Sequence, residues 1–185
     1  MNYFLRGLLI LGVLGILFGY MNQEFKPDKL TLENKKMVKE NRETVTYYKG
    51  SLKDVRNAVP FEIKTLSSKS RFKLNPTVFV KDFKNMKGKP KGQTALLVTT
   101  EYSDQKENDG VTFEIANFPM FDDMVKSRKY IEIEKNIKGK YDETPKFKVL
   151  TWKKDDLYYA LQLVDLNENH STSKDEVVKL AKSLQ

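Results

Sequence analysis

The chain has no cysteine among its 185 residues. A disulfide framework, a thiolate metal site and a cysteine nucleophile are therefore all excluded. The lipid-bearing cysteine of a bacterial lipoprotein is missing as well. Stability must come from packing, and the chain is long enough for one domain with a substantial core but too short for two large domains.

Histidine is nearly absent, because His170 is the only one. The sequence has no H-E-x-x-H pair, no G-x-S-x-G elbow and no glycine-rich phosphate loop after a strand. His170 lies in the polar stretch "NENHSTS", where we expect a solvated loop residue rather than a general base. We therefore predict no catalytic residue and no cofactor.

Negative charge is in the minority, since 25 acidic residues stand against 33 basic ones and the formal net charge is +8. Most of the basic residues are lysines, which attract anionic polymers and lipid headgroups through screened Coulomb forces. Such forces steer association more than they specify a partner. A solvated, lysine-rich surface explains the same composition.

Long apolar runs are confined to the amino terminus, at residues 7–21, "GLLILGVLGILFGYM". Counting back to Tyr3 adds Arg6 as the only charge, and a spanning helix needs about 17 to 25 residues. No A-x-A type of cleavage site follows the run. We expect an uncleaved membrane anchor over residues 3–21, with a cleaved signal peptide as the alternative.

The orientation of this anchor is argued from charge. Basic residues beyond the run outnumber Arg6 before it, and the positive-inside rule would place that side in the cytoplasm. A short basic end followed at once by an apolar stretch is, however, the form that export machinery recognises. We predict a domain outside the cytoplasm, and a cytoplasm-facing protein remains open. The basic residues after the run are Lys26, Lys29, Lys35, Lys36, Lys39 and Arg42.

Three regions follow from the pattern of the chain: an anchor at residues 1–21, a polar stalk at 22–43 and a folded domain at 44–185. "SLKDVRNAVP" (51–60) predicts a short helix with Ser51 and Asp54 at the capping-box spacing, and 171–185 predicts a second helix. We expect an α+β domain whose antiparallel sheet of about six strands carries the C-terminal helix. The strand-like runs are 77–83, 94–102, 111–118, 129–135, 146–152 and 157–164.

The hairpin "LTWKKDDLYYALQL" (150–163) contains the only tryptophan. An even-numbered loop places Leu150 and Trp152 on one face with Leu157, Tyr159, Leu161 and Leu163. We therefore expect Trp152 and Tyr159 to pack in the core. Tyr158 falls on the other face and is the better candidate for an aromatic that contacts a ligand.

The order of motifs resembles a known family. "SLKDVRNAVPFEI", strands ending in "LLVTTEY", "LTWKKDDLYYAL" and "SKDEVVKLAKSL" are similar to the C-terminal domain of unknown function found in membrane-anchored and lipoprotein-like envelope proteins of Gram-positive bacteria. The resemblance covers roughly residues 51–185 and implies an extracytoplasmic α+β domain with no assigned catalytic residues. "KTLSSKSRFKLNP" replaces the proline-rich segment that usually follows the "PF" strand, which puts any partner of that loop in doubt.

One loop has the spacing of a calcium site. Oxygen-bearing residues occupy positions 1, 3, 5, 7, 9 and 12 of such a register, although His170 stands where glycine is usual and a strand precedes the loop. Glu176 is also explained by a capping box with Ser173. A calcium site is thus an alternative to a capped helix. The register consists of Asp165, Asn167, Asn169, Ser171, Ser173 and Glu176.

Two further loops carry charge. "KNMKGKPKG" (84–92) presents Lys84, Lys87, Lys89 and Lys91 with no acid nearby in the sequence, so an anionic envelope polymer or a headgroup could bind there. "DQKENDG" (104–110) predicts a hairpin turn.

Three hypotheses about the activity remain open. We favour a non-catalytic binding or interaction module of the cell envelope, whose partners are the membrane and an anionic polymer or another envelope protein. The first alternative is an envelope enzyme that acts through carboxylates such as Asp104, Glu107 or Asp109. The second is a cytoplasm-facing membrane protein. We expect no nucleic acid partner, because this lysine loop lacks interleaved aromatic residues.

Overall fold

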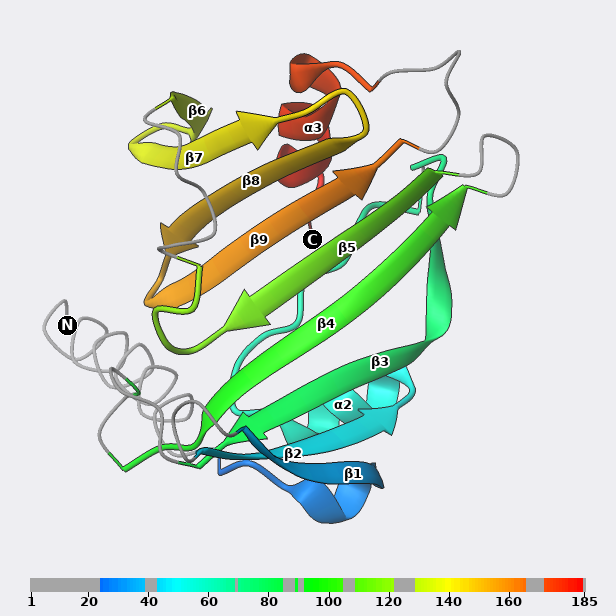
Figure 1. Ribbon diagram of the computed structural model, residues 1–185, viewed down its shortest axis with the longest axis vertical. Helices are drawn as coiled ribbons and strands as arrows, with labels where there is room; N and C mark the ends of the chain where they lie inside the picture. Colours follow the sequence, from blue (N-terminus) through cyan, green and yellow to red (C-terminus); the bar gives the residue numbers. More distant parts are fainter. Residues whose placement is uncertain are drawn as a thin grey trace, which may run out of the picture.

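A single antiparallel sheet dominates the structure. The computed structural model describes residues 24–38, 43–68, 70–84, 89, 92–104, 109–121, 129–165 and 172–184. Within these ranges, nine strands are β1 (Thr31–Val38), β2 (Glu43–Gly50), β3 (Lys73–Phe83), β4 (Ala95–Asp104), β5 (Asp109–Ala116), β6 (Tyr130–Glu134), β7 (Ile137–Glu143), β8 (Phe147–Lys154) and β9 (Leu157–Val164). Their order in the sheet is β1-β2-β3-β4-β5-β9-β8-β7-β6 (Figure 1).

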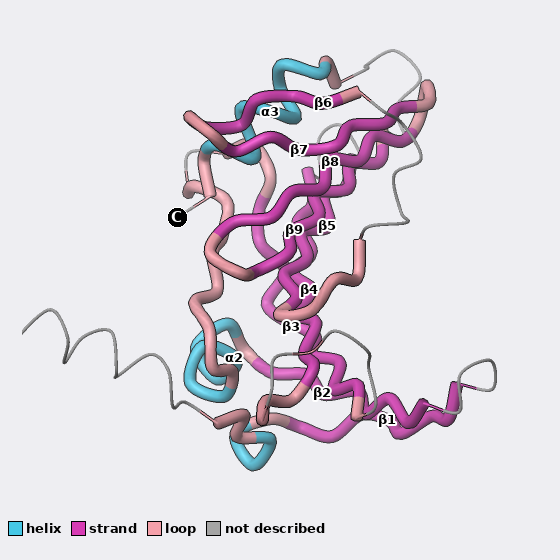
Figure 2. Tube along the Cα trace, turned by 90° about the vertical axis from the view of Figure 1, so that its left-hand side faces the viewer, coloured by secondary structure: helices cyan, strands magenta, loops and turns pink. Residues whose placement is uncertain are grey.

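Two α-helices in the described chain pack on the same face of this sheet (Figure 2). The predicted helix at 51–60 is present as α2 (Leu52–Ala58), and Ser51 and Asp54 form the predicted capping box. The C-terminal helix is present as α3 (Lys174–Lys182), where the Ser173 side chain accepts a hydrogen bond from the Glu176 amide. We call the side covered by α2 and α3 the helix face, and the other side the opposite face.

The predicted fold class is wrong, because the described residues form mostly antiparallel sheet with nine strands rather than an α+β domain with about six. The prediction missed β1, β2 and β7. The sequences of β1 and β7 are rich in charged residues, and β1 is an edge strand, in which charged side chains are common. A pattern of this kind is hard to distinguish from a solvated spacer. The sequence of β2, ETVTYYKG, has the threonine, valine and tyrosine typical of a strand and was overlooked beside the charged stretch before it.

The predicted stalk at residues 22–43 is corrected in the same way. It contains the 3-10 helix η1 (Pro27–Lys29) and strand β1. The Phe25 ring packs edge-on against Tyr48, with 5.6 Å between the ring centres, and the Lys26 amide donates to the Ala58 carbonyl. This stretch is therefore packed against β2 and α2.

The membrane prediction concerns another part of the chain. Among the described residues, no helix is long and apolar enough to cross a membrane. Residues 1–21, where a transmembrane helix is predicted, lie outside the described ranges.

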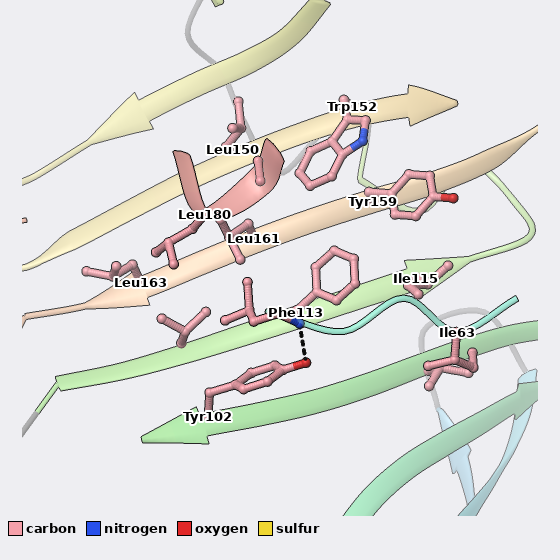
Figure 3. Packing of buried hydrophobic residues seen from close by; sticks show 14 of the residues in the cluster. Ile63, Tyr102, Phe113, Ile115, Leu150, Trp152, Tyr159, Leu161, Leu163 and Leu180 are labelled. Atoms are coloured by element: carbon pink, nitrogen blue, oxygen red, sulfur yellow. Dashed lines mark hydrogen bonds between the residues drawn. The ribbon is translucent and has the colours of Figure 1, made fainter. Parts of the chain in front are cut away.

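The larger core lies between the sheet and the two helices. Phe113 stacks near Trp152 and Tyr159, and the Trp152 and Tyr159 rings are 5.2 Å apart between centres (Figure 3). The Tyr102 hydroxyl accepts a hydrogen bond from the Leu66 amide, which ties the segment between α2 and β3 to the sheet. Other buried members from the strands include Val80, Leu96, Val98, Ile115, Tyr141, Leu150, Leu161 and Leu163.

A smaller apolar cluster lies on the opposite face. Phe118 and Phe121, from the segment after β5, pack with Phe83 of β3. Asn117 holds the start of this segment, since its side chain accepts from the Leu96 amide and donates to the Thr94 carbonyl. The described part of the segment therefore covers the opposite face where Phe83, Leu97 and Ala116 lie.

Candidate functional site

The hairpin of β8 and β9 sets the direction of Tyr158. Asp155 and Asp156 form a two-residue loop with φ of 50° and 60°, the left-handed conformation that a tight hairpin turn needs. Lys153 pairs directly with Tyr158 across the strands, and its ammonium lies 5.4 Å from the centre of the tyrosine ring. Asp156 pairs with Lys153 at 3.0 Å and raises its pKa. Tyr158 thus stands half-buried on the opposite face, beside a cation.

A hollow of about 180 Å³ lies beside Tyr158 on the opposite face. Strand register brings its lining residues from β6, β7 and β8 together, because Tyr130 pairs with Lys140 and Lys140 pairs with Thr151. Three lysines and two tyrosines line it, and none of the described lining residues is acidic. We call it the Tyr158 groove; it is lined by Phe121, Tyr130, Lys138, Lys140, Thr151, Trp152, Lys153 and Tyr158.

A second hollow of about 400 Å³ adjoins Tyr158 at the tip of the hairpin. Its character is mixed, because Asp155 and Asp156 line it with Lys153. Pro60 and Phe61 add apolar surface, and Gln93 and Asn117 add amides. Tyr158 therefore borders two hollows, of which the Tyr158 groove is the more cationic.

Trp152 and Tyr159 have the structural role that strand parity predicts. The Trp152 and Tyr159 side chains are buried and belong to the helix-face core. Burial raises the pKa of Tyr159 to about 12, so its hydroxyl stays protonated at neutral pH. The core prediction for this pair is confirmed.

The acidic candidates Asp104 and Asp109 lie opposite each other on β4 and β5, and both contact Arg71. One guanidinium nitrogen of Arg71 donates to Asp104 at 2.9 Å and to Asp109 at 3.0 Å. The Asp109 side chain is 0% exposed and the Asp104 side chain 9% exposed. Glu107 lies outside the described residues. The two carboxylates are brought together, but they are buried as partners of a cation.

The electrostatics of Arg71 fit a structural role. Burial would lower its pKa, but hydrogen bonds to Asp104 and Asp109 outweigh this and raise the pKa. Glu176 of α3 is 3.5 Å from the guanidinium, and the Thr172 hydroxyl accepts from it. Since Arg71 stays charged, it stabilises the anionic carboxylates. Both carboxylates are buried and turned toward Arg71.

The two described ends of the calcium register face protein donors. Both oxygens of Asp165 are engaged, one by Lys148 and the Thr172 amide and the other by the Thr172 hydroxyl. Burial would raise the pKa of Asp165, but Lys148 and Thr172 outweigh it and lower the pKa. Glu176 turns toward Arg71. These contacts do not favour calcium at Asp165.

The rest of that register lies outside the described ranges, namely Asn167, Asn169 and Ser171, as does His170. Within the described part of the chain, no group of three or more histidine, cysteine or acidic residues could hold a metal ion. Ser173 acts as the cap of α3. The calcium site stays a prediction without support from the described residues.

The lysine loop is less purely cationic than its sequence indicates. Lys89 donates to the Lys84 carbonyl at 3.0 Å, and both lysines lower the pKa of nearby Asp82, which burial raises more strongly. Lys87 and Lys91 lie outside the described residues. An acid is therefore close to the described part of the loop.

Sequence reasoning found Tyr158 but missed the lysines around it. Lys138 and Lys140 flank Gly139 in β7, and this period of two would have placed them on one face had the strand been predicted. Arg71 carried no local signal, because its partners lie 33, 38 and 101 residues away in sequence.

No protein-family model, no curated protein and no solved structure shows significant similarity to this chain. The resemblance to the envelope domain family therefore stays a prediction.

Proposed function

We propose that this protein is a non-catalytic binding module of the bacterial cell envelope that binds an anionic envelope polymer in the Tyr158 groove. The observation that supports the proposal is the gathering of Lys138, Lys140 and Lys153 with Tyr130 and Tyr158, without an acid among the described lining residues. In this proposal the apolar run at residues 3–21 holds the protein at the membrane, with the domain outside the cytoplasm.

The chemistry of the groove fits a flexible polyanion. Lysine ammonium groups are strongly hydrated point charges that attract phosphate or carboxylate groups without demanding one geometry. Tyrosine rings add apolar surface for the carbon skeleton between the charges. A polymer whose repeat alternates an anionic group with a short carbon unit meets both requirements.

The acidic cluster gives weaker support to an envelope enzyme. Asp104 and Asp109 are buried and share Arg71, so neither is arranged to donate a proton to a substrate. A binding module needs only the lysines and tyrosines that line the groove.

Binding of labelled poly(glycerol phosphate) to the full-length chain in neutral detergent tests the proposal. We expect binding that weakens as salt is raised, since exposed charges are screened beyond about 8 Å at physiological ionic strength. Replacing both Lys138 and Lys140 by glutamine should weaken binding about two- to thirty-fold, at about 0.2–1 kcal/mol for each exposed charge contact. Lys35→Gln, an exposed lysine of edge strand β1, is the matched control.

Salt-independent binding, or equal effects of the groove and control variants, would contradict the proposal. Neutral dextran should not bind. A loss caused only by Lys87→Gln and Lys89→Gln would move the site to the lysine loop. A reporter fused after Gln185 tests the orientation, and activity of the reporter in the cytoplasm would exclude an envelope role.

A further inference from the structure

The hollow at the tip of the β8 and β9 hairpin differs in chemistry from the Tyr158 groove. Its volume of about 400 Å³ is within the range of sites for small molecules. Four segments build it, namely the chain after α2, the chain before β4, the chain after β5 and the hairpin itself. Only Lys153 and Tyr158 line both hollows. We call it the hairpin-tip hollow; it is lined by Pro60, Phe61, Gln93, Asn117, Lys153, Asp155, Asp156, Leu157 and Tyr158.

The shape of this hollow is set by contacts inside the protein. The Asn117 side chain accepts a hydrogen bond from the Leu96 amide and donates one to the Thr94 carbonyl, so it fixes the wall next to β4. The hairpin loop is a tight turn in which Asp155 and Asp156 both have positive φ. A hollow that is formed before binding requires less ordering of the protein when a ligand enters.

Two polar side chains of the hollow are available to a ligand. Asp155 and Gln93 are exposed, and neither forms a hydrogen bond or an ion pair within the described ranges. A carboxylate accepts hydrogen bonds at two oxygens, and a side-chain amide both accepts and donates them. These two side chains therefore match hydroxyl groups, which also both donate and accept.

Apolar side chains supply the rest of the lining. Phe61, Leu157 and Tyr158 are all half-buried. A sugar ring has a face of carbon-bound hydrogens, which packs on the electron-rich face of an aromatic ring. Since the Lys153 ammonium already lies 5.4 Å from the centre of the Tyr158 ring, Phe61 is the ring that we assign to this contact.

The charges of the lining favour a ligand without net charge. Asp156 forms an ion pair with Lys153 at 3.0 Å, which leaves Asp155 as the unpaired charge among the described lining residues. A phosphate or carboxylate group would be repelled by Asp155. An ammonium group would be attracted to Asp155 but repelled by Lys153. A hydroxyl group binds beside either charge.

We propose that the hairpin-tip hollow binds a neutral sugar ring. In this site Asp155 and Gln93 bind the hydroxyl groups, while Phe61 packs against the carbon-bound hydrogens. The inference goes beyond the proposed function, because it assigns a separate site and an uncharged ligand. It does not require an anionic polymer in the Tyr158 groove.

Saturation-transfer NMR with methyl β-glucoside tests the inference on the full-length protein. The protein is kept in a detergent without a sugar headgroup, since a glycoside detergent would compete. We expect saturation of the ring protons of the glucoside and a millimolar affinity, because a single ring makes few contacts. Neutral dextran at the lower concentrations used for the anionic polymer therefore stays unbound. Glycerol, which has hydroxyl groups but no ring, should show much less transfer.

One double variant removes the polar contacts and keeps the turn. Asp155→Asn combined with Gln93→Ala should weaken glucoside binding at least about fivefold, because two hydrogen-bonding groups are altered or lost. Asparagine tolerates positive φ, so the hairpin turn is retained. The matched control is Asp175→Asn, which changes an exposed aspartate in the first turn of α3, outside the hollow. It should leave glucoside binding unchanged.

A second variant tests the aromatic contact. Phe61→Leu keeps an apolar side chain but removes the ring, so it should also weaken glucoside binding. Thermal melting shows whether this variant folds, because Phe61 also packs against the helix-face core. If it does not fold, the double variant of Asp155 and Gln93 still decides the result.

The outcomes separate this inference from the proposed function. No transfer to the glucoside, or equal affinity of the wild type and the Asp155 and Gln93 variant, would overturn the sugar site. Tighter binding of tetramethylammonium that is lost in Asp155→Asn would assign the hollow to a cation and also overturn it. Replacing Lys138 and Lys140 should leave glucoside binding unchanged. If that replacement does not weaken polymer binding, the proposed function fails while the sugar site stands.

Discussion

The two faces of the sheet use tyrosine in different ways, and Tyr158 and Tyr159 show the difference within two consecutive residues. Tyr159 points to the helix face, where it is 3% exposed and stacks with Phe113 and Trp152. Tyr158 points to the opposite face, beside Lys153 and next to two hollows. The helix face holds the larger core, whereas the opposite face carries cations next to half-buried rings. The contrast shows that parity along one strand separates a tyrosine of the core from a tyrosine that lines two hollows.

Truncating the two tyrosines separately tests the difference between the faces. Tyr159→Ala should lower the free energy of unfolding by about 4 kcal/mol, because it opens a cavity among stacked rings in the core. Tyr158→Ala should lower it by only about 1 kcal/mol, because the ring is half-buried, yet it should weaken polymer binding. Urea unfolding of the full chain measures both. Equal losses would contradict the division between the faces.

The next prediction concerns the stability contributed by Arg71, which contacts the buried carboxylates Asp104 and Asp109. Arg71→Met should destabilise the protein by about 3 kcal/mol, because the buried carboxylates Asp104 and Asp109 would lose the charge of the guanidinium that contacts both. This value is the lower end of the range of about 3–5 kcal/mol for breaking a buried ion pair, because the Arg71 side chain is 27% exposed. Adding Asp109→Asn should restore part of the loss.

The control for Arg71 is an ion pair at the surface. Lys154 and Glu134 are 2.7 Å apart with side chains 30% and 48% exposed. Lys154→Met should therefore change the free energy of unfolding by at most about 1 kcal/mol. An equally small effect of Arg71→Met would show that the acidic cluster is not structural, and the enzyme alternative would regain support.

Gly139 supplies a third and smaller effect. A Cβ atom there would lie 2.7 Å from a Leu150 methyl, 2.9 Å from an Ile133 methyl and 2.9 Å from the Thr151 carbonyl oxygen. Gly139→Ala should cost about 2 kcal/mol, because backbone cannot move aside as a flexible side chain can. Gly110→Ala, with its nearest neighbour at 4.0 Å, is the control. Similar midpoints of urea unfolding for the two variants would contradict this packing.

The predictions that the structure confirms depend on residues close together in the sequence. The capping box of Ser51 and Asp54 spans three residues, and the parity of Trp152 and Tyr159 depends on one two-residue loop. Both are decided by neighbours along the chain. Tyr158 was found as a candidate ligand aromatic for the same reason, because parity alone assigns it to the other face.

Contacts between distant segments account for what was missed. Arg71 reaches Asp104 and Thr172, which lie 33 and 101 residues away, and no spacing rule connects them. Strand β7 has Gly139 at its centre, and glycine normally weakens a strand prediction. In the structure, the missing side chain leaves room for the Leu150 and Ile133 side chains to pack against this strand. Because β7 was not predicted, Lys138 and Lys140 were not recognised as neighbours of Tyr158.

Asp82 provides the last prediction, because it is a buried carboxylate on the helix face with one oxygen that no described residue satisfies. Asp82 of β3 is 8% exposed, and one of its carboxylate oxygens has no hydrogen-bond partner among the residues that the structure describes. Burial raises its pKa, although Lys84 and Lys89 partly oppose the shift. Because the folded pKa lies above the unfolded value of about 3.9, the wild type loses stability as pH rises between these two values.

Asp82→Asn removes the charge and should therefore stabilise the protein at neutral pH by about 1 kcal/mol. The gain should disappear in acid, where Asp82 is protonated and resembles the amide. Asp165→Asn gives the opposite sign, because the folded pKa of Asp165 is lowered and its stabilisation is present above the unfolded pKa. Urea unfolding at several pH values measures both variants. If Asp82→Asn raised the free energy of unfolding equally at all pH values, the buried charge of Asp82 would not be the cause of the lower stability of the wild type.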